Sequence, residues 1–155
     1  MTIKKGIGKF LKYGTLVSSF CFIAVTMAQV YARFFMESAP SWTEEAARFF
    51  FIYAMSFAAG LAMKGNYYVK FDVVYNKLNN KQKQILDALV SFFTILLFLI
   101  LTCYAISFVN VGITERSPSV GFSMSIAFGS IVVMGLFISI YAIWDVIKAF
   151  KKLKQ

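Results

Sequence analysis

The chain has 155 residues, of which 59% are hydrophobic, 18% aromatic and 15% charged, and its mean hydropathy is +0.70. This composition leaves too little polar surface to cover a soluble globule and predicts an integral membrane protein. The net charge of +9 comes from lysines beside apolar runs. The chain carries no nucleic-acid-binding motif, so no nucleic-acid partner is expected.

Four apolar runs are each long enough to cross a hydrocarbon core of about 30 Å. They occupy residues 14–36, 46–63, 85–109 and 120–147. The sequence therefore predicts an all-α integral membrane protein, a single domain over residues 1–155 with four transmembrane helices. Helix starts are expected at Asn79 or Asn80 for the third span, and at Ser117 followed by Pro118 for the fourth.

The first span is expected to remain in the protein rather than to be cleaved as a signal peptide. Its apolar run continues from Gly14 for about 19 residues to Arg33, beyond the 7 to 15 of a signal-peptide core. The preceding residues include a possible interfacial helix, although Gly6 and Gly8 weaken it.

The sequence indicates where the second span meets each of the two membrane interfaces. Ser41 and Glu44 match the Ser-x-x-Glu capping box, and Trp42 is placed for the headgroup level. The following apolar run contains one charge, Arg48, and ends at Lys64.

The basic residues predict the orientation. All 13 lysines lie in the N-terminal segment, the segment between the second and third spans, or the C-terminal segment. With four spans, these three segments share one side of the membrane. The positive-inside rule then places both termini in the cytoplasm.

A short interfacial helix is expected between the second and third spans, at residues 69–78. Phe71, Val74, Tyr75 and Leu78 recur there at helical spacing. A plain cytoplasmic loop is the alternative. The side chains expected to contact membrane phospholipid are Lys64, Lys70, Phe71, Tyr75 and Lys77.

Small residues at four-residue spacing allow helix backbones to approach closely in lipid. Candidate packing positions are Ser56 and Gly60 in the second span, and Ser125 and Gly129 in the fourth.

Residues suited to catalysis are scarce. The chain has no histidine, no phosphate-binding glycine loop and no nucleophile with a partner base, so neither an enzyme nor a cofactor or metal site is predicted. Arg33, Arg48 and Asp145 lie near span ends, whereas coupled transport favours charge near the midplane. The chain is therefore not expected to transport a substrate alone.

The outer end of the second span is the candidate surface for a protein partner. Its residues are Glu37, Trp42, Glu44, Glu45 and Arg48. The alternative is local ion pairing, since Glu44 and Glu45 precede Arg48 by four and three residues.

The order Ser41-Trp42-Thr43-Glu44-Glu45, Arg48, Gly60, Lys64-Gly65 and Val69-x-Phe71-Asp72 resembles the small membrane subunit of tripartite ATP-independent periplasmic (TRAP) transporters, the DctQ-like family. Two departures are Tyr68, where members often have histidine, and the absence of a proline near Phe128.

The resemblance implies a multi-pass subunit of the bacterial inner membrane without catalytic activity. Its implied partners are a large membrane subunit that binds Na⁺ and substrate, and a periplasmic substrate-binding protein that delivers an organic acid. Sialic acid and C4-dicarboxylates are the substrate classes implied. A small four-helix homodimeric exporter and a membrane-embedded enzyme remain as alternatives.

Overall fold

The computed structural model of the chain describes residues 2–36, 40–65 and 78–153. These residues form four long α-helices and no extended sheet. The helices are α1 (Thr2–Phe35), α2 (Trp42–Gly65), α4 (Asn80–Gly112) and α5 (Met124–Leu153). Each is long and apolar enough to cross a membrane. The described part of the chain thus confirms the predicted all-α fold with four transmembrane helices.

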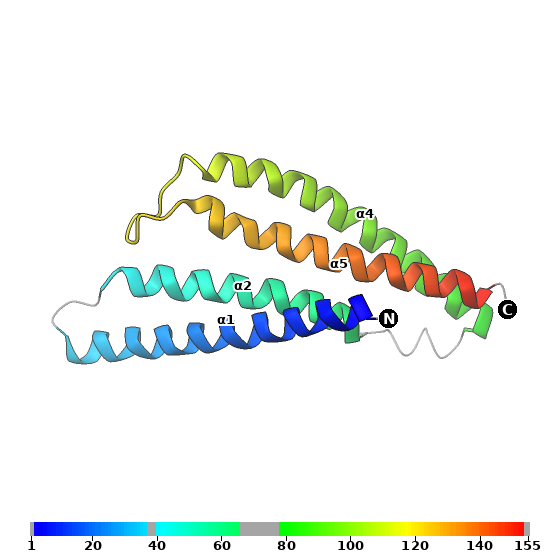
Figure 1. Ribbon diagram of the computed structural model, residues 1–155, viewed down its shortest axis with the longest axis horizontal. Coiled ribbons are helices and arrows are strands. Elements are labelled where there is room, and N and C mark those ends of the chain that lie inside the picture. Colours follow the sequence, from blue (N-terminus) through cyan, green and yellow to red (C-terminus); the bar gives the residue numbers. More distant parts are fainter. Residues whose placement is uncertain (1, 37–39, 66–77, 154–155) are drawn as a thin grey trace.

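The helices form two antiparallel pairs that meet through α2 and α5 (Figure 1). Neighbouring helices follow the order α1, α2, α5, α4, because α1 packs on α2, α2 on α5 and α5 on α4. We call the end where α1 and α4 finish and α2 and α5 begin the loop end. The opposite end, which holds both ends of the chain, is the terminal end.

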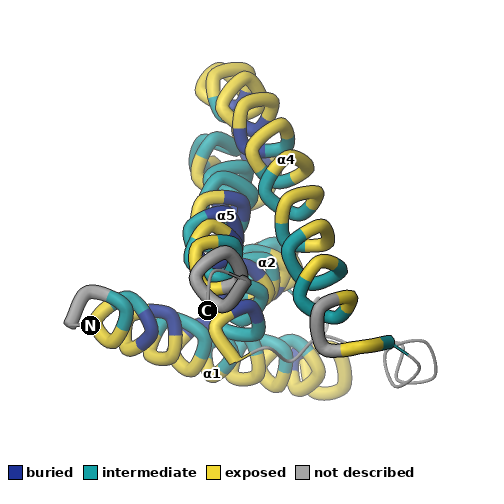
Figure 2. The backbone as a smooth tube through the Cα atoms, turned by 90° about the vertical axis from the view of Figure 1, so that its right-hand side faces the viewer, coloured by how far each residue is buried: buried dark blue, intermediate teal, exposed yellow. Residues whose placement is uncertain are grey.

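Burial within the protein is concentrated in the two middle helices. In the most apolar stretch of each helix, 28% of α2 residues and 33% of α5 residues are buried, against 6% for α1 and 11% for α4. The tube drawing shows the same contrast, with α1 mostly exposed (Figure 2). Exposed apolar side chains along α1 and α4 must therefore be covered by lipid or by another protein.

The core lies where α1, α2 and α5 meet, in the half of the molecule nearer the terminal end. Its buried members are Leu11, Met63, Ile138, Tyr141 and Ala142. The helices approach closely at Gly60, which has no side chain to keep them apart. A Cβ placed on Gly60 would lie 2.9 Å from the Cβ of Phe137 and 3.2 Å from Cδ1 of Leu11.

The helices extend beyond the predicted spans at most of their ends. In particular, α1 begins at Thr2, so the N-terminal residues continue the first helix rather than forming a separate interfacial one. The expected start of α4 is confirmed, because Asn79 precedes its first residue and its backbone N–H donates to Oε1 of Gln82 at 3.0 Å.

One predicted helix start was wrong, and at another the start is confirmed but the predicted capping contacts are not seen in the described ranges, since α2 begins at Trp42, directly after Ser41. The fourth helix begins at Met124, because Ser117 and Pro118 belong to a tight turn before it. Among the described residues, no hydrogen bond joins Ser41 to Glu44. Instead, the backbone N–H and the hydroxyl of Thr43 both donate to the carbonyl of Pro40, at 3.2 and 2.8 Å.

Candidate functional site

The connection between α4 and α5 is a short hairpin over residues 115–123. Arg116 and Ser123 form an antiparallel bridge, and the backbone N–H of Ser117 donates to the carbonyl of Phe122 at 2.9 Å. The turn closes when the N–H of Gly121 donates to the carbonyl of Ser117 at 3.0 Å. Gly121 has a φ of 76°, a conformation that side chains with a Cβ rarely adopt.

Glu45, in the first turn of α2, binds this hairpin. Its carboxylate accepts hydrogen bonds from the hydroxyl of Ser117 and from the backbone N–H groups of Ser119 and Val120. The two backbone bonds measure 3.2 and 3.1 Å to Oε2. One carboxylate therefore satisfies several donors of a turn that would otherwise depend on water, and it ties α2 to the segment before α5.

Glu44, the acidic residue next to Glu45, makes a different contact. Glu44 pairs with Arg48 one turn along α2, at 3.3 Å between Oε1 and a guanidinium nitrogen. Both side chains are largely exposed, at 68% and 72%. An exposed pair of this kind contributes about 0.3–0.5 kcal/mol at most. Glu44 and Arg48 consequently remain accessible to a partner, whereas Glu45 is engaged within the protein.

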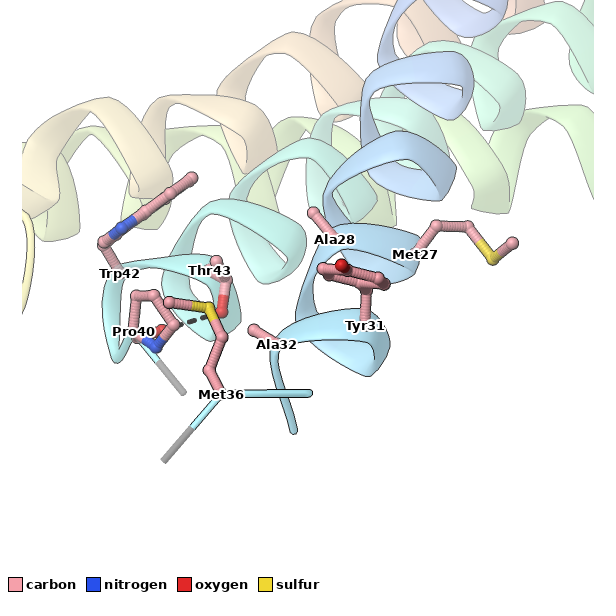
Figure 3. A pocket seen from close by; sticks show the side chains of 8 residues that line it. All are labelled: Met27, Ala28, Tyr31, Ala32, Met36, Pro40, Trp42 and Thr43. Atoms are coloured by element: carbon pink, nitrogen blue, oxygen red, sulfur yellow. Dashed lines mark hydrogen bonds between the residues drawn. The ribbon is translucent and has the colours of Figure 1, made fainter. Parts of the chain in front are cut away.

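Trp42 lines two apolar hollows at the loop end. The larger, of about 570 Å³, is an open groove between the end of α1 and the start of α2. Its lining is shown in Figure 3: Met27, Ala28, Tyr31, Ala32, Met36, Pro40, Trp42 and Thr43. The second, of about 240 Å³, lies between Trp42, the aromatic face of α2 and the hairpin. In the groove, Thr43 already uses its hydroxyl on Pro40, so the surface is suited to apolar contact.

Aromatic side chains fix the position of the hairpin and of α5 against α2. The ring of Phe49 meets that of Phe122 edge to face, with centroids 5.5 Å apart. Deeper in the membrane, the hydroxyl of Tyr53 donates to the carbonyl of Ile126 at 2.7 Å. Contacts made by Glu45, Phe49 and Tyr53 thus join α2 to the hairpin and to the start of α5.

The small residues occupy different environments. Ser56 is buried and donates to the carbonyl of Ile52 in its own helix. Gly60 lies at the junction of three helices, as described above. Ser125 bonds the hydroxyl of Ser123 beside the end of α4, and Gly129 faces the hydroxyl of Tyr53 at 3.6 Å from an ideal Cβ.

Other predicted residues lie at the terminal end or outside the described ranges. Lys64 is exposed in the last turn of α2. Glu37 is not described, and neither is most of the predicted interfacial segment 69–78. That segment includes the predicted lipid contacts Lys70, Phe71, Tyr75 and Lys77.

Sequence reasoning missed the partners of Glu45. The Ser117-Pro118 pair predicts a helix start, and nothing in local spacing connects Ser117 to a carboxylate 72 residues earlier. It also missed Tyr53, whose hydroxyl would have been recognised as needing an acceptor in an apolar span. Across the described residues, no three histidine, cysteine or acidic side chains gather as metal ligands would.

The comparisons with known proteins agree with this architecture. Residues 22–152 match the sequence model of the family described as tripartite ATP-independent periplasmic transporters, DctQ component. The chain is also 24% identical over 152 residues to a Haemophilus influenzae protein described as a TRAP transporter small permease protein, covering 98% of this chain and 92% of that protein.

Proposed function

The chain belongs to the DctQ family of TRAP transporters, and we propose that as the small permease subunit it braces the large membrane subunit and helps to dock the periplasmic substrate-binding protein. The transport proposed is Na⁺-coupled uptake of an organic acid, of the sialic acid or C4-dicarboxylate class. The terminal end is then cytoplasmic and the loop end periplasmic, as the lysine distribution favours.

The unequal burial of the helices carries the bracing role. Within the described residues, α2 and α5 supply most of the internal contacts, while α1 and α4 expose apolar surface along their length. In lipid, helices associate through close packing and a few polar contacts. A large membrane subunit that packs against one of the outer helices would use this surface while α2 and α5 hold the subunit together.

The loop end supports the docking role. Glu45 holds the hairpin in place, and the accessible Glu44 and Arg48 lie beside it on α2. Exposed charges on a preorganised surface favour specific and rapid association with a soluble partner. Arg33, Arg48, Asp87 and Asp145 all lie towards helix ends. Their positions favour a structural subunit over an exporter with a midplane charge.

Purification of the tagged chain from its native membrane tests the proposal. We expect a stoichiometric large multi-span partner, and uptake only when both subunits and the binding protein are reconstituted. Recovery of the chain as a homodimer that transports alone would support the exporter instead. Substrate turnover by the purified chain would support the membrane-embedded enzyme.

A further inference from the structure

Three lysines from three different helices gather at the terminal end. Lys4 lies in the first turn of α1, Lys64 in the last turn of α2 and Lys148 near the end of α5. The Lys64 side chain crosses α1 at Gly8, one turn beyond Lys4. The end of that side chain occupies the space that a Cβ at residue 8 would fill.

The aromatic side chains of α5 hold Lys4 in this cluster. Its ammonium nitrogen lies 5.6 Å from the ring centroid of Tyr141 and 5.5 Å from that of Trp144. Such contacts attract a cation to the face of the ring. Lys148 is positioned by Asp145, whose Oδ1 lies 3.4 Å from its ammonium nitrogen.

The cluster has more positive than negative charge. Lys64, Lys148 and Asp145 are the charged neighbours of Lys4 within the described residues. Among the described residues, three ammonium groups thus face one carboxylate, so that within this part of the chain positive charge exceeds negative charge by two. Like charges held together repel one another, and a bound anion would offset that repulsion.

The surroundings favour a lipid as the source of the anion. The cluster lies where the apolar helices end, beside the indole of Trp144, a side chain typical of the headgroup level. Ile143 and Ile147, on the same stretch of α5, are 41% and 47% exposed. An acyl chain could cover this apolar surface while its headgroup lies at the lysines, which a free phosphate ion cannot do.

We propose that Lys4, Lys64 and Lys148 bind the phosphate of an anionic phospholipid between α1, α2 and α5. The bound headgroup joins the ends of three helices that the core brings together within about two turns of the three lysines. This site goes beyond a general attraction of lysines to the inner leaflet, because it depends on these three residues and not on the other lysines of α1.

Lipid titration of the delipidated full-length chain tests the site. Native mass spectrometry would follow binding of phosphatidylglycerol, with phosphatidylcholine and inorganic phosphate as separate arms. The variant K4Q/K64Q/K148Q should bind phosphatidylglycerol about tenfold more weakly than the wild type. The control K5Q/K9Q/K12Q removes the same charge from exposed positions of α1. It should change the affinity less than twofold.

Each other outcome overturns the proposal. Equally weakened binding of phosphatidylglycerol in both triple variants would mean that the lysines attract anionic lipid diffusely, without a specific site. Displacement of the lipid by inorganic phosphate at equal concentration would mean a free-anion site. Equal binding of phosphatidylcholine would remove the role of net headgroup charge. If the triple variant does not fold, the single variants K148Q and K12Q replace the pair, with the same order of affinities expected.

Discussion

The carboxylate of Glu45 and the hydroxyl of Ser117 form a hydrogen bond across 72 residues of sequence. This contact links the first turn of α2 to the hairpin that leads into α5. It places an internal polar connection at the surface that we propose as the docking site of a soluble partner. The exposed Glu44–Arg48 pair lies beside Glu45 on α2. A charge used within the protein and charges accessible to a partner therefore lie within one turn of each other.

Glu45→Ala should loosen the hairpin. Without the carboxylate, the backbone N–H of Ser119 loses its acceptor, and that of Val120 keeps only a longer bond of 3.4 Å to the hydroxyl of Ser117. Hydrogen exchange of both groups should therefore become about tenfold faster. Exchange measured by mass spectrometry on the full chain in nanodiscs would show it. Glu44→Ala is the matched control, because Glu44 does not touch the hairpin, and exchange there should be unchanged. Unaltered exchange of the hairpin N–H groups in Glu45→Ala would contradict the role of Glu45 in holding the hairpin.

Arg48→Ala should lower receptor-dependent uptake without lowering the yield of the membrane complex. The guanidinium is largely exposed and pairs only weakly with Glu44, so its loss should affect docking more than folding. Uptake in proteoliposomes at limiting binding protein, normalised to complex content, measures the effect, for which we expect a several-fold reduction.

Arg33→Ala is the control for that experiment, since Arg33 is an exposed cation at the same end of the molecule but on α1. Its uptake should stay close to the wild-type value. Equal losses in both variants would indicate a general charge effect, and normal uptake in Arg48→Ala would remove Arg48 from the docking surface.

The fold could be predicted because it depends on the length and polarity of continuous segments. Four apolar runs within 155 residues leave few alternatives to four membrane-spanning helices. The helix start at Asn79 could also be predicted. Gln82 lies three residues later, where its side chain can accept a hydrogen bond from the backbone N–H of Asn79. Both are local properties that a sequence displays directly.

The candidate site was only partly predictable, because it depends on contacts between distant segments. The acidic start of α2 was visible, and the i, i+4 spacing anticipated the pairing of Glu44 with Arg48. The role of Glu45 was not visible, since it requires the hairpin at Ser117 to fold back on α2. Pro118 also suited a helix start, and only the hairpin hydrogen bonds show that it belongs to a turn.

Tyr53→Phe should weaken the contact between α2 and α5. The hydroxyl donates to the carbonyl of Ile126 at 2.7 Å, and an interhelical hydrogen bond in a membrane contributes about 0.6 kcal/mol on average. The free energy of unfolding in mixed micelles should fall by about that amount. Tyr31→Phe is the control, because Tyr31 is 62% exposed on α1. An equal loss in both variants would contradict the assignment.

The orientation can be tested by cysteine labelling in intact cells. In a background without Cys21 and Cys103, a cysteine at Ser119 should react with an impermeant thiol reagent, because that residue is exposed at the loop end. A cysteine at Lys5 should react only after the membrane is permeabilised. The reverse pattern would invert the topology and place the hairpin in the cytoplasm.

Gly60→Ala should destabilise the protein, although alanine is the better helix former. The new methyl group would lie 2.9 Å from the Cβ of Phe137 and 3.2 Å from Leu11, and neither neighbour is the free end of a long polar side chain. Overpacking of this kind costs about 1–3 kcal/mol, more than the 0.5–1 kcal/mol or so gained by replacing a helical glycine.

Gly129→Ala provides the matched comparison in the same pair of packed helices. Its nearest neighbour would be the hydroxyl of Tyr53 at 3.6 Å, an ordinary contact, so the helix-propensity gain should remain and the free energy of unfolding should stay level or rise. Unfolding of both variants in mixed micelles measures the difference. Equal stability of the two would contradict the close approach of α1, α2 and α5 at Gly60, on which the buried core depends.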